Sequence, residues 1–213
     1  MSHSTQNDSL VLSYLGLRKA IGVIGILLPF VLVIGKTILV DSGIESSISA
    51  YYYTVMRDVF VGSLCAIGIF LMSYRGYEWI DEVAGKIGTI FAIGTALFPT
   101  SPQHADTLRI FIGQLHYVFA MGLFLTLAFY SLKLFRKTNP KQQPTLQKIQ
   151  RNMVYTVCGY GILTCIALII LTAFLPVDSL IFNWQPVFWL ESLAIILFGI
   201  SWFVKGEAIL KDK

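Results

Sequence analysis

Residues 20–35 read AIGVIGILLPFVLVIG, an apolar run that contains no charged side chain. A hydrocarbon core about 30 Å thick is crossed by roughly 20 helical residues, so this run and its flanks predict a membrane-spanning helix over residues 19–40. Five further stretches have the same character, at residues 55–74, 83–98, 107–135, 149–175 and 186–204. The chain therefore predicts an all-α, polytopic bundle of six membrane-spanning helices.

The composition agrees with a membrane protein. Hydrophobic residues make up 55% of the chain and charged residues only 13%, with a mean hydropathy of +0.70, whereas a soluble domain has about a quarter charged residues. We expect a mobile polar tail over residues 1–16, a single transmembrane domain over residues 17–210, and one long basic cytoplasmic loop over residues 136–151. A cleaved signal peptide is the alternative for the first apolar run, but no Ala-x-Ala-like site follows it.

The 16 Lys and Arg residues fall on alternate sides of the predicted helices. With a cytoplasmic N-terminus, only Lys36, Arg57 and Arg109 lie on the outer side. This distribution follows the positive-inside rule and predicts that both termini are cytoplasmic. The net charge of +4 is explained by basic loops beside an anionic leaflet, so membrane lipids are the expected partners and nucleic acid is not.

Polar and ionisable residues gather on the predicted outer side, where such groups often mark functional positions. Arg109 and His116 are spaced so that they share one helix face with Gly113. If that face points inward, both side chains can meet Asp58 and Glu191 in a polar cavity that opens outward. The candidate ligand-binding residues are Ser47, Ser49, Tyr52, Arg57, Asp58, Arg109, Gln114, His116 and Glu191.

A purely structural interpretation of the same residues stays open. Asp58 and Glu191 lie near predicted helix N-termini, where the helix dipole favours a carboxylate. Catalysis is a further possibility, with Asp58, His116 and Glu191 as weak candidates for an acid or base. The candidate nucleophiles are Ser47, Ser49 and Thr54 with His116 as base. The chain has no G-x-S-x-G elbow, however, and serines near helix starts usually act as caps.

No metal or other cofactor is expected. His104, His116, Asp58 and Glu191 are suitable ligand types, but their spacing matches no metal-binding motif. The three cysteines lie inside predicted helices and form no C-x-x-C pair, which argues against disulfides and a cysteine metal site.

Three short motifs carry a resemblance to known sequences. Ser47-Ile48-Ser49 precedes the second predicted helix, Arg57-Asp58 lies at its start, and Phe98-Pro99 follows the third. In these motifs the chain resembles uncharacterised bacterial membrane proteins that are similar to the family called domain of unknown function 998. The resemblance implies a six-helix bundle in the bacterial inner membrane and supplies no reaction.

The leading functional hypothesis is a non-enzymatic membrane protein whose outward-facing polar cavity binds a lipid or small amphiphile, for sensing, transport or assembly. An intramembrane enzyme acting on an outer-leaflet lipid is one alternative. Glu45 and Ser49 are faintly similar to a Glu and Ser pair of alkaline ceramidases, but the zinc-binding H-x-x-x-H of those enzymes is missing. A small channel or transporter subunit is the other alternative, with Gly- and Ala-rich helices at residues 55–74 and 83–98 supporting a homo-oligomer.

Overall fold

The computed structural model describes residues 2–74, 78–102, 105–138, 143–176 and 180–210. No strand occurs in these residues, so the predicted all-α fold is confirmed. The long helices are α1 (Ser2–Leu39), α2 (Arg57–Met72), α3 (Trp79–Leu97), α4 (Thr107–Phe129), α5 (Leu146–Thr172) and α6 (Pro186–Lys205). Three single-turn elements join them, the 3₁₀ turns η1 (Ser49–Tyr53) and η3 (Leu180–Trp184) and the π turn η2 (Tyr130–Leu134).

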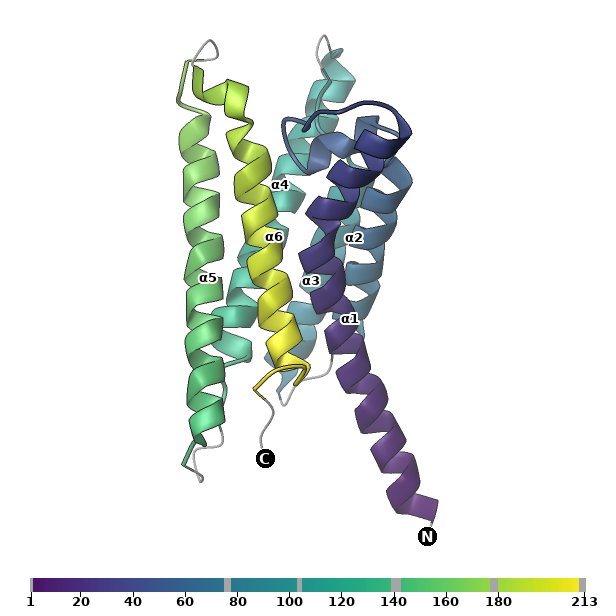
Figure 1. The fold of residues 1–213 in the computed structure, drawn as a ribbon, viewed down its shortest axis with the longest axis vertical. Coiled ribbons are helices and arrows are strands. Elements are labelled where there is room, and N and C mark those ends of the chain that lie inside the picture. The colour runs from purple at the N-terminus through teal and green to yellow at the C-terminus, as the bar shows by residue number, and fades with distance from the viewer. Residues whose placement is uncertain (1, 75–77, 103–104, 139–142, 177–179, 211–213) are drawn as a thin grey trace.

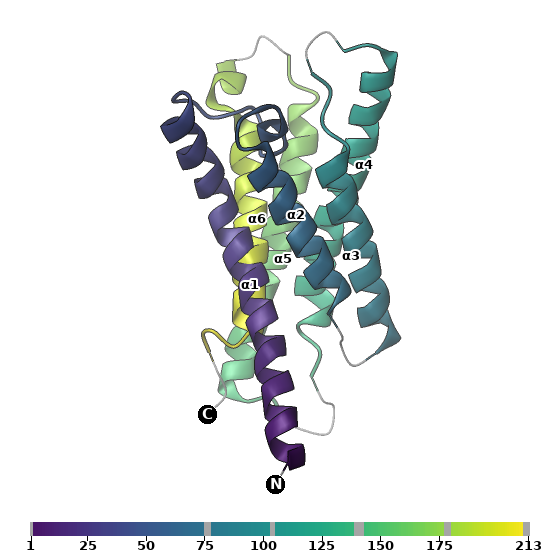
Figure 2. The same cartoon turned by 90° about the vertical axis from the view of Figure 1, so that its right-hand side faces the viewer.

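The six long helices form one bundle (Figure 1), and their contacts close it into a ring. Each packs on the next in chain order, and α6 returns to pack on α1. Figure 2 shows α2, α3 and α4 side by side on one flank of the bundle. Turn η1, which precedes α2, lies at one end, and the start of α1 and the end of α6 lie at the opposite end, which we call the terminal end.

Four helices are long and apolar enough to cross a membrane. These are the segments Leu15–Leu39, Thr107–Leu134, Leu146–Thr172 and Pro186–Lys205. Helix α2 has 16 residues and is about 24 Å long, and α3 carries Asp81, Glu82 and Lys86 in its first turns. Four of the six predicted segments thus have the length and hydropathy that a membrane-spanning helix needs.

The N-terminal segment differs from the sequence-based expectation. Residues 1–16 were predicted to form a tail, but α1 begins at Ser2 and projects beyond the other helices (Figure 1). The physical reason is that extending an existing helix costs far less than starting one. The residues before Gly16 contain no proline or glycine to stop that extension.

Helices α1 and α6 pack with their backbones in close contact. A Cβ atom added to Gly199 of α6 would lie 2.7 Å from the carbonyl oxygen of Gly22 and 2.7 Å from the amide nitrogen of Ile26, both on α1. Only glycine fits at this crossing, as expected where small residues let helices approach within a membrane. The Gly- and Ala-rich α3 likewise buries its small residues, and its packing partners are α2 and α4.

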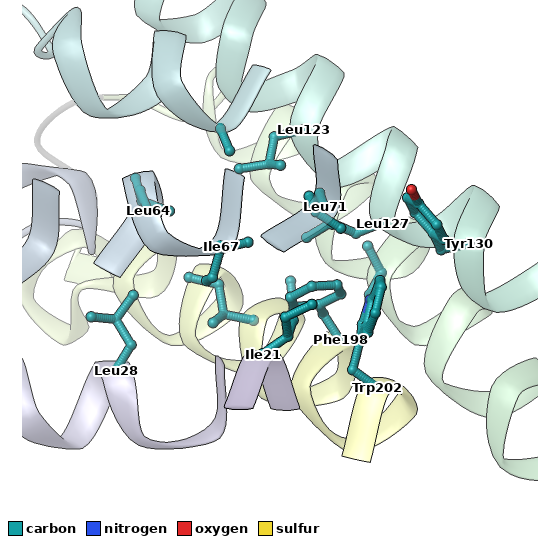
Figure 3. Close-up of a cluster of buried hydrophobic side chains, with 14 of the residues drawn as sticks. Ile21, Leu28, Leu64, Ile67, Leu71, Leu123, Leu127, Tyr130, Phe198 and Trp202 are labelled. Atoms are coloured by element: carbon teal, nitrogen blue, oxygen red, sulfur yellow. The ribbon is translucent and has the colours of Figure 1, made fainter. Parts of the chain in front are cut away.

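The centre of the ring is filled by apolar side chains from α1, α2, α4 and α6 (Figure 3). The buried residues labelled there are Ile21, Leu28, Leu64, Ile67, Leu71, Leu123, Leu127, Tyr130, Phe198 and Trp202. Towards the terminal end the core becomes aromatic, because the Trp202 ring packs on Tyr74, Tyr130 and Phe135 with centroids 5.1–5.5 Å apart.

Candidate functional site

Glu191 connects α6 to the loop that precedes α2. Its Oε2 atom accepts a hydrogen bond from the backbone N–H of Ile48 at 2.7 Å, and the N–H of Ser49 also bonds to this carboxylate. These two amides begin turn η1, where the unsatisfied N–H groups of a helical turn favour an anion. The carboxylate therefore caps η1, as the structural interpretation of the sequence expected for a group of this kind.

Glu191 also lies between two hollows. One is an internal cavity of about 30 Å³, roughly the space of one water molecule. The other is a groove of about 500 Å³ between α4, α5 and α6. Phe124 and Glu191 line both, so these two side chains form the partition between the groove and the bundle interior.

The groove is apolar along most of its length. Its walls are Tyr117, Ala120, Met121 and Phe124 of α4, Ile166, Ile169, Ile170, Thr172, Ala173 and Phe174 at the end of α5, and Val187 and Glu191 of α6. Glu191 is the one ionisable acid among them. A volume of this size is typical of sites that hold a small organic ligand, with few polar groups to orient it.

A second groove, of about 410 Å³, lies between α3 and α4. Its lining is apolar apart from Thr126, whose hydroxyl donates to the carbonyl oxygen of Gly122 at 2.7 Å. This groove has no polar group left to orient a ligand headgroup. The groove that ends at Glu191 is therefore the stronger candidate site.

His116 holds the loop between α3 and α4. Its ring is buried, and Nδ1 lies 2.6 Å from the carbonyl oxygen of Phe98. A carbonyl can only accept, so Nδ1 carries the proton and donates it. The Oγ atom of Ser101 donates to the carbonyl of Arg109 at 3.1 Å, and Ser101 also lies directly over Gly113. Gly113 and His116 thus pack on residues 98–101, whereas Arg109 contributes only its backbone carbonyl to this contact.

The other predicted site residues of the outer side lie on the surface. The side chains of Arg57, Asp58, Arg109 and Gln114 are exposed. Arg57 donates to the hydroxyl of Tyr52 at 2.7 Å and stacks over its ring, 4.3 Å from the centroid. The helix periodicity that places His116 inward turns Gln114 outward, two residues away on the same helix.

Two of the three candidate nucleophiles form hydrogen bonds within the turn. Ser47 accepts a hydrogen bond from the backbone N–H of Ala50 at 3.0 Å, and Thr54 donates to the carbonyl of Tyr51 at 2.9 Å. Ser49 is buried and lines the 30 Å³ cavity. Burial raises the pKa of the neighbouring Tyr51, so this phenol stays neutral. The hydroxyls of Ser47 and Thr54 thus contribute to the η1 fold, and His116 is hydrogen-bonded to Phe98 instead.

In the described part of the chain, no three side chains of His, Cys, Asp or Glu lie close enough together to hold a metal ion. His104, which was considered as a metal ligand from its residue type, lies outside the described residues. Asp58, His116 and Glu191 are accordingly found at three separate places: the exposed start of α2, the α3–α4 loop contact, and the η1 cap.

The sequence pointed to Ser49 and Glu191, which the structure brings together, but it missed the groove. The walls of the groove are ordinary aliphatic and aromatic residues of spanning helices, such as Met121 and Ile170. Such residues face lipid in most membrane helices, so no sequence signal distinguishes them. The groove depends on how α4, α5 and α6 pack together, which the tertiary structure decides.

The comparisons with known proteins identify no family for this chain. No protein-family model, curated protein or solved structure matches the chain. The function therefore has to be inferred from the site itself.

Proposed function

We propose that this integral membrane protein binds a single-chain or double-chain amphiphile, with an alkyl chain in the α4–α5–α6 groove and the polar head at Glu191. The observation that carries the proposal is an apolar groove of about 500 Å³ that ends at one carboxylate. We place the protein in the bacterial inner membrane, in accordance with the resemblance to the domain of unknown function 998 group and with the positive-inside pattern.

The position of the groove supports a hydrocarbon ligand. Its walls belong to three helices that are each long and apolar enough to cross a membrane. A groove between membrane-spanning helices is reached by the alkyl chains of lipids. When one alkyl chain replaces another there, no backbone polar group is left without a hydrogen bond. A water-soluble metabolite would instead leave its polar groups without hydrogen bonds against Met121, Phe124 and Ile166.

The chemistry of Glu191 supports a choice of head group. An ionised carboxylate is an acceptor only and repels an anion. A head with hydroxyl or ammonium donors therefore fits, whereas a fatty-acid carboxylate does not. Because Glu191 also caps η1, occupancy of the groove would be transmitted to the loop before α2, which suits a sensing or assembly role.

The test uses three amphiphiles with the same oleoyl chain: monooleoylglycerol, oleylamine and oleate. The full-length protein in a neutral detergent is titrated with each, and the melting temperature is followed. We expect monooleoylglycerol and oleylamine to raise it more than oleate does. Ala120→Trp, which fills the groove wall, should abolish the increase for all three.

The matched control is Val157→Trp, which adds an indole to an exposed position of α5 outside the groove. It should respond as the unmodified chain does. Equal responses of the Ala120→Trp and Val157→Trp proteins would show that the amphiphile binds elsewhere, and the proposal would fail. A response that favours oleate would retain the groove and reject Glu191 as the head-group contact.

A further inference from the structure

Large apolar side chains are exposed where the chain passes from α5 to α6. Phe174 follows the end of α5 and is 79% exposed, and Leu180 and Trp184 of η3 are 80% and 77% exposed. Ile181 of η3 is exposed as well, and we call these four residues the apolar rim. Figure 1 shows the described parts of this connection at the same end of the bundle as η1. Exposed apolar side chains that gather in this way mark a surface that contacts another protein or a membrane.

The connection between α5 and α6 carries almost no charge. From Ala173 to Leu190 the sequence has a single charged side chain, that of Asp178, which lies outside the described residues. The loop before α2, at the same end of the bundle, is different. There Lys36 pairs with Asp41 and Glu45, at 3.1 and 2.9 Å. Charged groups of that kind favour water, whereas the side chains of the apolar rim favour an apolar environment.

The apolar rim adjoins two segments that are long and apolar enough to cross a membrane. One of them, Leu146–Thr172, ends just before Phe174, and the other, Pro186–Lys205, begins just after Trp184. The ends of a membrane-spanning helix lie at the surface of the hydrocarbon layer. This position places the apolar rim at the depth of the lipid head groups, where tryptophan rings are enriched because they have an apolar body and a polar N–H.

The apolar rim is continuous with the apolar flank of the bundle. Phe174 also lines the α4–α5–α6 groove, together with Val187 in the first turn of α6. Trp189 follows in the same helix and is exposed too. Exposed apolar side chains therefore lead from the rim onto the sides of the helices that have spanning length, which are the surfaces that lipid chains contact.

The apolar rim is small for a protein partner. A stable protein interface takes about 20–30 residues from each side, whereas the rim consists of four. Insertion into a lipid leaflet needs no matching surface, and a few large apolar side chains that leave water are enough to favour it. A lipid surface is thus the partner that fits these residues.

From these observations we propose that the apolar rim is inserted into the lipid leaflet at the η1 end of the bundle, at the boundary between head groups and acyl chains. Inserted there, the rim fixes the depth of the α5–α6 pair in the membrane, while the charged loop before α2 stays in water. The proposal is separate from the function proposed for the groove, because the rim contacts the leaflet whether or not an amphiphile is bound.

The experiment uses the fluorescence of Trp184. The full-length protein is placed in phosphatidylcholine nanodiscs, in which both membrane faces are open to the buffer. Bromine on the acyl chains quenches tryptophans that touch lipid, and iodide in the buffer quenches those that touch water. One lipid carries bromine close to the head group, and a second carries it close to the methyl end. The contribution of Trp184 is the difference between the unmodified chain and Trp184→Phe.

We expect bromine close to the head group to quench the Trp184 contribution most, and iodide to quench it least. Leu180→Glu places a charge in the apolar rim, and a carboxylate is drawn to water. This variant should reduce the quenching of Trp184 by lipid bromine, increase its quenching by iodide and shift its emission to the red. The matched control is Val55→Glu, which adds the same charge at an exposed apolar position before α2 and should leave the Trp184 contribution unchanged.

Four outcomes would overturn the proposal. Stronger quenching of Trp184 by iodide than by lipid bromine would place the apolar rim in water. Strongest quenching by bromine at the methyl end would place it in the bilayer centre. Quenching by neither would show that a second copy of the chain or another protein covers it. Equal effects of Leu180→Glu and Val55→Glu would show that the response is not specific to the rim. Each of these results leaves the groove to its own test, since no amphiphile is added.

Discussion

The carboxylate of Glu191 on α6 accepts a hydrogen bond from the backbone N–H of Ile48, which lies 143 residues earlier in the chain, at 2.7 Å. The contact fixes the start of η1 to the sixth helix. The same carboxylate also lines the α4–α5–α6 groove. One side chain thus links the loop before α2 to the candidate ligand site.

Replacing Glu191 should lower the stability of the folded protein. Glu191→Leu removes the acceptor of the Ile48 amide, and an unsatisfied buried donor costs roughly 2 kcal/mol. Glu191→Gln keeps one acceptor oxygen and should cost less. The measurement is thermal unfolding in detergent, with Glu82→Gln, which alters an exposed ion pair, as the control. Equal stability of all three variants would contradict the capping role.

His116 should be a structural residue of the α3–α4 loop. His116→Phe keeps an aromatic ring but leaves the carbonyl of Phe98 without its donor, so we expect a loss of about 1–2 kcal/mol in the free energy of unfolding. Gln114→Leu changes an exposed position of the same helix and should be nearly neutral. If amphiphile binding were lost in His116→Phe at unchanged stability, His116 would instead belong to a ligand site.

The α1–α6 crossing should tolerate no side chain at Gly199. Gly199→Ala forces its Cβ against backbone atoms of Gly22 and Ile26, and overpacking of this kind costs about 1–3 kcal/mol. Gly62→Ala is the matched control, because a Cβ at that helical position has no neighbour within 4 Å. Alanine there should stabilise the protein slightly. Both variants are compared by thermal unfolding, and similar melting temperatures would rule out the close crossing.

The Lys137 contact predicts a loss of stability in alkali. Burial alone would lower the pKa of Lys137, but hydrogen bonds to Asp81 and Glu78 outweigh it and raise the pKa above the usual 10.5. A cation whose pKa is higher in the folded state stabilises the fold below the unfolded pKa and loses that contribution as the pH rises through the folded pKa.

Melting curves recorded from pH 9 to 12 test this, with those limits set about 1.5 units on either side of the reference pKa of Lys. Above pH 10.5 the melting temperature of the unmodified chain should fall more steeply with pH than that of the Lys137→Gln variant. Lys133→Gln, which changes an exposed lysine of the π turn, should follow the unmodified chain. Parallel curves for the two variants would contradict the contribution of the Lys137 contacts.

The sequence by itself determined the helical class, the positions of the apolar segments and the helix face that Gly113 shares with His116. These properties are local, since they follow from the length of an apolar run and from the 3.6-residue period. The extension of α1 to Ser2 was not predicted from the sequence, because a helix can propagate through a polar segment once its apolar part is formed.

Only the tertiary structure decided which residues meet. Glu191 reaches the amide of Ile48 rather than His116 or Arg109, and α6 returns to pack beside both α1 and α5. Such pairings depend on the order of helices around the ring and on where glycines allow close approach, as at Gly199. Helical periodicity specifies the direction of a side chain, whereas the packing of the helices specifies what lies in that direction.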